Sequence, residues 1–416
     1  MENDIEISQK RISASRAIFI ACWLSYAAIS MGKSVYSASM ASMIAEGMFT
    51  KSYSGIINSG FYLLYGGAQL LGGKLIDKIS PIIWINISMV GTALSMLGMA
   101  FADGFIPMLV IWSLDGLLQF AIWPAIVRVI AEYVIPSQRK KAMTLISFSY
   151  CAGMLSSYLC GSVVLSFAHW RVFFIVAAVI LGGFSVYWVL ASRASLKYLS
   201  KNDIEEKEVS AEAASHGPKK SVIISSGLFL LFIPSFIRTC LDLGLKSWVP
   251  TMIMESYDVS ASFANALTTV LVLINLSGVF FCTWLYPKIV KNAAVGFGIC
   301  FAAALPMTVL LLFTGKIPVI AVVLLLSGLT TMMYAGHQFN NVIIPMFFAK
   351  YHKEGSIAGI LNAIASFGAV AATFGFGYLA DNFGWTGTII SWIAITATAL
   401  IFCLMASPAF GRFTKE

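Results

Sequence analysis

Apolar runs of about 20 residues recur along the whole chain, separated by shorter polar connections. Folded as an α-helix, a run of that length crosses a hydrocarbon core about 30 Å thick. About twelve such runs are found, near 17–44, 53–76, 82–102, 106–135, 142–167, 170–191, 221–253, 262–286, 293–315, 317–348, 356–380 and 386–407. The pattern predicts an all-α membrane protein with about twelve transmembrane helices and the lipid bilayer as its solvent.

One long polar stretch divides the chain into two parts of about six runs each. It is rich in Lys, Glu, Ser and Ala, a composition typical of a flexible linker. The predicted parts are an N-terminal six-helix half at 1–191, a cytoplasmic linker at 192–220 and a C-terminal six-helix half at 221–416. The halves resemble each other, since Pro124 and Pro345 each follow a polar residue, Gln119 and Asn340, by five positions. Two pseudo-symmetric halves with a site between them are a transporter architecture.

Composition excludes a soluble fold and indicates an orientation. Of the 416 residues, 59% are hydrophobic and only 11% are charged, too few to cover a water-exposed surface. Twenty of the 27 Lys and Arg lie at the termini and on every second connection, while the alternate connections hold only Lys51, Arg171 and Lys316. The positive-inside rule predicts a multi-pass plasma-membrane protein, expected in a bacterial inner membrane, with both termini cytoplasmic. Because these short loops account for the net charge of +8, no nucleic-acid partner is expected.

The sequence carries no recognisable catalytic or metal-binding pattern. All seven cysteines fall inside apolar runs without metal-ligand spacing, so they read as small membrane-embedded side chains. There is no Walker loop, Gly-x-Ser-x-Gly elbow, HExxH or CxxC. We therefore expect no enzyme activity, no cofactor and no metal, and any transport should be driven by gradients.

Lys33 and Asp242 each place a charge inside an apolar run. Lys33 lies thirteen residues before Glu46, the first acid after its run, and Asp242 lies thirteen residues before Glu255. Two opposite charges therefore fall at matching depth in the two halves. Because a bilayer disfavours a buried ion by several kcal/mol, ionisable residues at that depth usually line a water-filled path. We expect both side chains to face one central polar site.

Five short segments carry a family resemblance that covers most of the chain outside the linker and termini. They are YGGAQ at 65–69, GKLIDK at 73–78, DGLLQ at 115–119, GILNA at 359–363 and GYLAD at 377–381. The chain resembles the major facilitator superfamily, and within it the organophosphate:phosphate antiporters and their anion:cation symporter relatives. The resemblance implies two halves that rock about a central site, with Gly73, Asp77 and Lys78 forming a gate.

The chain departs from that branch at the positions where the antiporters bind phosphate. Laid over this sequence, the two family arginines fall at Lys33 and Asp242, the family lysine at Gln69 and the family histidine at Tyr150. A lysine lacks the planar fork with which arginine binds phosphate, and an aspartate repels phosphate. The resemblance therefore implies a substrate other than a dianionic phosphate ester.

A Lys/Asp pair suits a different solute. Lys33 would bind a carboxylate, and Asp242 a hydroxyl, an amine or a coupling proton, so a sugar acid, another carboxylate or a zwitterion would fit. The alternative is a direct ion pair that only holds the halves together. Further candidates for the site are Asp115, Gln119, Gln69, Tyr150, His337, Asn341, Tyr36 and Tyr65. Arg238, one turn from Asp242, would neutralise it, and His337 would either couple protons or bond a neighbouring helix.

Together these features predict a secondary active transporter for a small polar organic solute, working by alternating access, coupled to H⁺ or Na⁺ and functional as a monomer. One alternative is a membrane receptor that senses a solute without moving it. The others are a phosphate-ester antiporter with an altered site and a passive facilitator.

Overall fold

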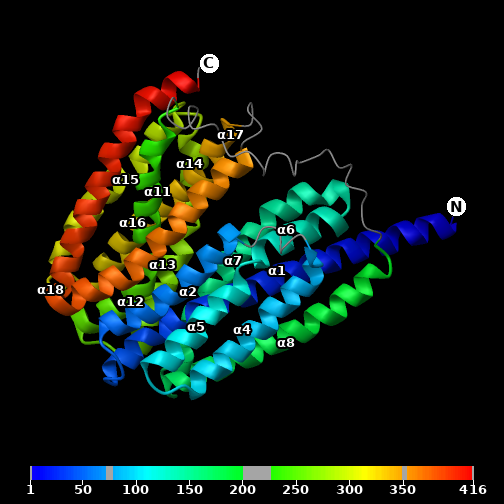
Figure 1. The fold of residues 1–416 in the computed structure, drawn as a ribbon, viewed down its shortest axis with the longest axis horizontal. Helices are drawn as coiled ribbons and strands as arrows, with labels where there is room; N and C mark the ends of the chain where they lie inside the picture. Colours follow the sequence, from blue (N-terminus) through cyan, green and yellow to red (C-terminus); the bar gives the residue numbers. More distant parts are fainter. Residues whose placement is uncertain (1, 72–77, 200–225, 349–353, 415–416) are drawn as a thin grey trace.

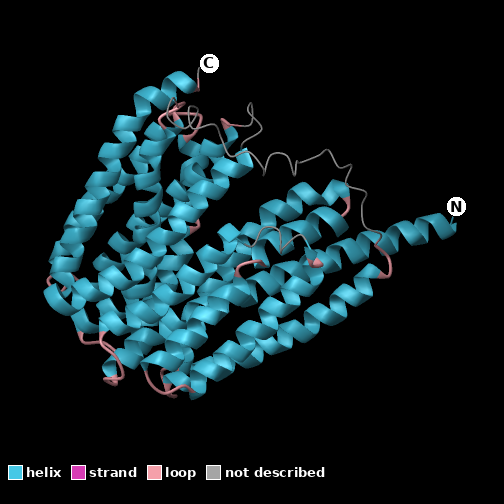
Figure 2. Cartoon of the chain, in the orientation of Figure 1, coloured by secondary structure: helices cyan, strands magenta, loops and turns pink. Residues whose placement is uncertain are grey.

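The structure is a computed structural model that describes residues 2–71, 78–199, 226–348 and 354–414. Helices make up almost all of the described chain, and no strand occurs in those ranges (Figure 2). They form two bundles that correspond to the first and second parts of the sequence (Figure 1). Both termini lie at the end where the bundles diverge, which we name the terminal end; the opposite end, where the bundles meet, is the loop end (Figure 1).

The first bundle contains six crossings. Its helices are α1 (Glu2–Ala45), α2 (Lys51–Leu71), α4 (Pro81–Phe101), α5 (Phe105–Gln119), α6 (Ile122–Tyr133), α7 (Pro136–Val164) and α8 (Trp170–Leu196). The predicted run 106–135 is thus two helices in line. Pro124 explains the break, because proline has no N–H to donate and its ring clashes with the carbonyl of Phe120, four residues earlier.

The second bundle has more interruptions. Its elements are η1 (Leu228–Leu231), α11 (Phe232–Thr239), η2 (Cys240–Gly244), α12 (Leu245–Tyr257), α13 (Ala261–Asn275), α14 (Ser277–Leu285), α15 (Ala293–Leu310), η3 (Leu311–Phe313), α16 (Val319–Gln338), η4 (Phe339–Ile343), α17 (Ile344–Met346) and α18 (Glu354–Phe413). The segments η2 and η4 are π-helical turns, a geometry that is frequent at functional sites. The turn η4 lies just before Pro345, as the break between α5 and α6 lies before Pro124.

The helix α18 covers two predicted crossings. Its 60 residues are about three times the length that one crossing requires, and the chain turns at Gly384, whose φ of 66° and ψ of −177° suit glycine alone. Within the described ranges ten segments are long and apolar enough to span a membrane, and the last of them, Ile357–Phe413, contains this turn. Together with α2, which packs along α18 and α5, they give the twelve crossings.

Close helix contacts join the two bundles near the loop end. A Cβ placed on Gly55 of α2 would lie 2.4 Å from the carbonyl oxygen of Thr373, and one on Gly377 of α18 would lie 2.5 Å from that of Lys51. Only glycine allows α2 and α18 to approach this closely.

Candidate functional site

Lys33 lies on α1 against three aromatic rings of α2. Its Nζ is 4.3 Å from the ring centre of Tyr65, 5.2 Å from that of Tyr62 and 5.4 Å from that of Phe61. The side chain is partly exposed and, within the described ranges, forms no salt bridge. Aromatic faces attract a cation by about 0.5–2 kcal/mol. They hold the ammonium in place without neutralising it, so its charge remains open to an anion.

Asp242 has its charge compensated by its own helix. The Arg238 Nη1 lies 3.6 Å from Asp242 Oδ2, and Lys246 contacts Oδ1 from the following turn. The three residues are spaced four apart, which places them on one face, and each is at most 7% exposed. The structure therefore contains no direct ion pair between Lys33 and Asp242.

Tyrosines fill the region between the two charges. Tyr62, whose ring lies beside Lys33, is also close to Asp242. The same holds for Tyr150 of α7, which is partly exposed and lies 6.4 Å, centre to centre, from the ring of Tyr26. Lys33 and Asp242 thus border one aromatic region without touching.

The predicted pair His337 and Asn341 lies near Lys246, to which Tyr334 connects it. A His337 ring nitrogen is 3.1 Å from Asn341 Nδ2, and the ring stacks on Tyr334 with centres 6.1 Å apart. Tyr334 also lies 5.6 Å from Lys246 Nζ, and its hydroxyl is 3.4 Å from the sulfur of Cys151 in the first bundle. These groups offer several hydrogen-bonding atoms beside the cations.

Asp115 and Gln119 form a buried pair on α5. The Gln119 Nε2 donates to Asp115 Oδ2 at 2.9 Å, and neither side chain is more than 1% exposed. The charge of Lys33 reaches Asp115, although the two do not form a salt bridge in the described chain.

Several predicted site residues have other contacts. Tyr36 is fully buried against Trp112, and its hydroxyl donates to the Ser54 carbonyl at 3.1 Å, so it packs α1 onto α2. Gln69 accepts a bond from Asn362 Nδ2 at 3.2 Å, which links α2 to α18. Of the predicted gate residues Gly73, Asp77 and Lys78, the first two lie outside the described residues, and Lys78 is exposed.

A polar layer between the bundles was not foreseen from the sequence. The Tyr158 hydroxyl of α7 donates to the Lys246 carbonyl at 2.7 Å. That carbonyl has lost its usual helix partner, because the residue four positions later is Pro250. Nearby, Asn58 Nδ2 lies 3.3 Å from Ser247 Oγ across the same interface. The proline in α12 was the available signal, since it frees one carbonyl for a partner from another helix.

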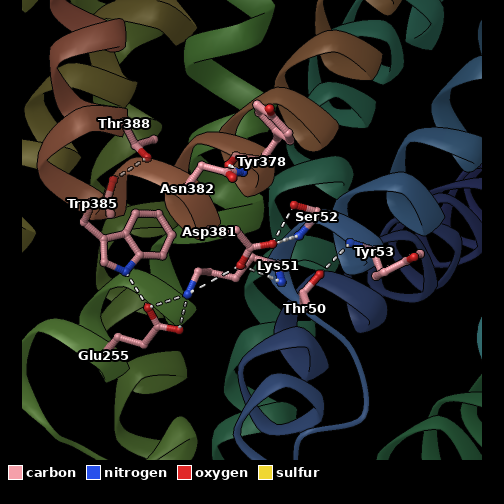
Figure 3. A network of polar contacts seen from close by, with 11 residues as sticks. Thr50, Lys51, Ser52, Tyr53, Glu255, Tyr378, Asp381, Asn382, Trp385 and Thr388 are labelled. Carbon is pink, nitrogen blue, oxygen red and sulfur yellow. Dashed lines mark hydrogen bonds and ion pairs between the residues drawn. The ribbon is translucent and has the colours of Figure 1, made fainter.

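At the loop end, five residues form an interaction that we name the clasp: Lys51, Ser52, Glu255, Asp381 and Trp385 (Figure 3). Lys51 Nζ lies 3.1 Å from Glu255 Oε1 and 3.8 Å from Asp381 Oδ1. The Asp381 carboxylate also accepts the backbone N–H groups of Lys51 and Ser52, the first residues of α2, so it caps that helix from the other bundle. The clasp therefore ties the bundles together at this end.

No cluster of metal-ligating side chains occurs in the part of the chain that the structure describes. In the central region Arg238 and Lys246 compensate Asp242, and aromatic rings surround Lys33.

Residues 22–373 match the profile of the Major Facilitator Superfamily, which is more than half of the chain. The chain belongs to that superfamily. It is therefore a multi-pass membrane protein of a transporter family that binds small molecules, and its relatives are transporters and a sensor, none of them an enzyme.

Curated relatives bear out the resemblance to the organophosphate:phosphate antiporter branch that the sequence motifs indicated. A probable hexose phosphate transport protein of Chlamydia pneumoniae is 22% identical over 99% of this chain and 96% of its own length. The membrane sensor protein UhpC of Escherichia coli K12 is 22% identical over 100% and 97%. A D-galactonate transporter of Escherichia coli O6:H1 is 21% identical over 85% and 86%.

Solved structures confirm the fold. A bacterial homolog of the human lysosomal transporter Spinster, in an inward-facing and occupied conformation, superimposes with a TM-score of 0.78 at 14% identity, over 95% of this chain and 97% of its own. A D-xylose–proton symporter gives a TM-score of 0.69 at 13% identity, over 94% and 96%. The prediction of an all-α major facilitator fold is confirmed.

The sequence predicted that Asp242 would repel phosphate, but in the structure Arg238 and Lys246 outweigh that carboxylate. Repulsion by Asp242 is thus a weaker reason against a phosphate substrate than the sequence indicated.

Proposed function

We propose that the protein is a secondary active transporter that carries a sugar acid, or a similar small monocarboxylate, by alternating access. Membership of the superfamily supports transport. The observation that carries the substrate class is Lys33, a cation that is without a salt-bridge partner in the described ranges and lies on an aromatic surface.

The charges of the site favour an anion. Three cations, Lys33, Arg238 and Lys246, face two carboxylates, Asp115 and Asp242, which leaves one positive charge in excess. Arg238 and Lys246 both contact Asp242, whereas Lys33 makes no salt bridge within the described ranges, so Lys33 is the cation that has a free position for a ligand. A single ammonium suits one carboxylate, whereas a phosphate dianion is better matched by the paired donors of an arginine.

The surroundings of Lys33 favour a substrate whose carboxylate is attached to a carbon skeleton with several hydroxyl groups. Aromatic faces such as Tyr65 pack against the C–H groups of a sugar, and His337, Asn341 and Tyr334 offer bonds to its hydroxyls. A relative that transports D-galactonate is consistent with this class.

The remaining properties follow from the same proposal. Twenty of the 27 basic residues lie, in the sequence, near the termini or on every second connection, which supports cytoplasmic termini in a bacterial inner membrane. The loop end, held by the clasp, is then the outer side. Accumulation of an anion against the membrane potential requires coupling to an inward cation gradient, H⁺ or Na⁺. Transport by a monomer is expected.

Counterflow in proteoliposomes tests the proposal. Vesicles loaded with unlabelled D-galactonate, a hexuronate, a hexose phosphate or glycerol 3-phosphate are diluted into the same labelled solute. We expect exchange of the sugar acids and little exchange of the phosphates. Exchange of phosphate esters alone would contradict the substrate class and support an antiporter with an altered site.

A sensor is the second candidate, because UhpC matches the whole chain about as well as the transporters do. A sensor would bind a sugar acid, measured by a thermal shift of the purified protein, and would show no counterflow. Binding together with counterflow would exclude a pure sensor.

A further inference from the structure

A groove outside the central site opens between α15 and α16, near the loop end of the second bundle. Its volume is about 420 Å³, and the seven side chains that line it are all apolar. On α16 the lining residues Ala321, Leu324 and Leu325 share one face of the helix, and on α15 Met307 and Leu310 do the same. The groove is therefore a continuous apolar surface along both helices.

The groove has a closed inner end and a fixed rim. At the inner end α15 and α16 approach closely, since a Cβ placed on Gly328 would lie 2.7 Å from Met307 Sδ. At the rim the hydroxyl of Tyr257 donates to the Ile317 carbonyl at 2.7 Å, which anchors the connection between the two helices. From Leu325 to the start of α16 the groove follows about 9 Å of helix, compared with roughly 15 Å of hydrocarbon in one leaflet. This length suits the upper part of one acyl chain that lies parallel to the helices.

The open side of the groove faces lipid. Three of its side chains, Leu310, Phe313 and Leu324, are 48%, 50% and 57% exposed. Because the chain spans a membrane, acyl chains cover this surface. A concave apolar surface touches an acyl chain on more sides than a single helix does, so a chain in the groove gains additional van der Waals contacts.

The rim carries a charge that the contacts between helices leave unexplained. Of the three basic residues on the connections at the loop end, Lys51 and Arg171 each pair with an acid. Lys316 is exposed, lies between the groove residues Phe313 and Ile317 in the sequence, and forms no ion pair in the ranges that the structure describes. A lysine at the end of a membrane helix reaches the level of the lipid headgroups, where phosphate is the available anion.

We propose that the groove is a binding site for an anionic phospholipid, with one acyl chain between α15 and α16 and the phosphodiester at Lys316. Phosphatidylglycerol and phosphatidylethanolamine both carry that phosphate, but the ammonium group of phosphatidylethanolamine already compensates it and is repelled by Lys316. The site therefore prefers phosphatidylglycerol. It is formed by the second bundle alone and does not depend on the proposed function.

Photochemical labelling in vesicles tests the site. The full-length protein is reconstituted in phosphatidylethanolamine and phosphatidylglycerol, and a trace of the phosphatidylglycerol carries a photoreactive group in the upper part of one acyl chain. Mass spectrometry then maps the labelled peptides. We expect the label to be concentrated on residues 307–313 and 317–325, and unlabelled phosphatidylglycerol to compete about fivefold better than phosphatidylethanolamine. Label spread evenly over the lipid-facing residues would indicate annular lipid only and would overturn the proposal.

Substitutions separate the two parts of the site. Ala321→Trp fills the groove and should remove most of the label, whereas Ala302→Trp, at an exposed position of α15 outside the groove, should leave it unchanged. Lys316→Ala should lower labelling by phosphatidylglycerol about fivefold, since one lysine near the surface attracts an anionic lipid by about 1 kcal/mol. Lys316→Arg should preserve it. Unchanged labelling of Lys316→Ala would contradict the contact with the headgroup.

A second copy of the chain is the alternative occupant of the groove, and dilution distinguishes it from lipid. If another copy covered the groove, labelling per protein molecule should rise as the ratio of protein to lipid in the vesicles is lowered. That result would overturn the proposal. For a lipid site, labelling per protein molecule should stay constant across the dilution.

Discussion

Trp385 donates its indole N–H to Glu255 Oε2 at 2.7 Å, and in the other bundle Trp170 makes the same bond to Glu46 Oε2 at 3.0 Å. Glu46 directly follows α1, and Glu255 lies in the last turn of α12. Trp170 is the first residue of α8, and Trp385 directly follows the Gly384 turn within α18. The two bonds therefore occupy equivalent positions in the two halves, as expected of an internal repeat.

The repeat differs in the second partner of each glutamate. Glu46 pairs with His169 of its own bundle at 2.9 Å, whereas Glu255 pairs with Lys51 of the opposite bundle. In the first half the glutamate pairs within its own bundle, whereas in the second half it belongs to the clasp, which joins the two bundles. The loop end is therefore held by contacts that must break when the halves rock.

Asp381→Asn should weaken the clasp and favour the state that is open at the loop end. The substitution removes a charge that caps α2 and pairs with Lys51, an effect of about 1–3 kcal/mol, or roughly 5- to 100-fold in the ratio of the two states. Spin labels on Asp103 and Lys316, one exposed position in each half, would report the longer distance. Glu46→Gln, which affects one bundle only, should leave the distance distribution as it is.

Tyr158→Phe should destabilise the contact between the bundles. It leaves the Lys246 carbonyl, already without a helix partner because of Pro250, with no hydrogen bond, at a cost of about 1–3 kcal/mol. Thermal unfolding in detergent measures the loss. Tyr36→Phe is the control, because it removes a similar bond, to the Ser54 carbonyl, within one bundle. Since that carbonyl lies inside a regular helix, the loss of stability should be smaller. Equal losses would contradict the account.

Gly55→Ala should reduce both stability and transport. Its new methyl group would lie 2.4 Å from the Thr373 carbonyl oxygen, so α2 and α18 would have to separate. Gly67→Ala, on the same helix, meets no described atom within 4 Å and should be neutral or stabilising by up to about 1 kcal/mol. Melting temperatures and counterflow rates of the two variants check this, and a Gly55→Ala protein as active as the wild type would be inconsistent with the close contact.

Much of the fold was predictable because lipid imposes a simple rule on chain length. Apolar runs located the crossings, and the matched prolines Pro124 and Pro345, which indicated a repeat, correspond to matching helix breaks that the runs did not predict. The run 356–380 and the run 386–407 were separated at the right place, since Gly384 provides the turn. The position of a residue within its apolar run therefore indicates its depth in the membrane.

The site was less predictable because depth does not determine which face of a helix a residue occupies. The spacing of four predicted that Arg238 would lie beside Asp242, and it does; Lys246, four residues after Asp242, shares the same face. The rings of Phe61 and Tyr62 under Lys33 depend on how α1 and α2 are rotated against each other, which a single sequence does not reveal. The clasp was missed for the same reason, as its members come from three separate segments.

The affinity of Lys33 variants for a sugar acid tests the central claim most directly. Titration calorimetry of purified wild type, Lys33→Ala and Lys33→Arg with D-galactonate gives the dissociation constants. Removal of one partner from a buried charge pair costs about 2–5 kcal/mol, so Lys33→Ala should weaken binding by roughly 30-fold or more, and Lys33→Arg by less. If Lys33→Ala binds the sugar acid as tightly as the wild type, Lys33 does not hold the substrate carboxylate, and the proposed site is wrong.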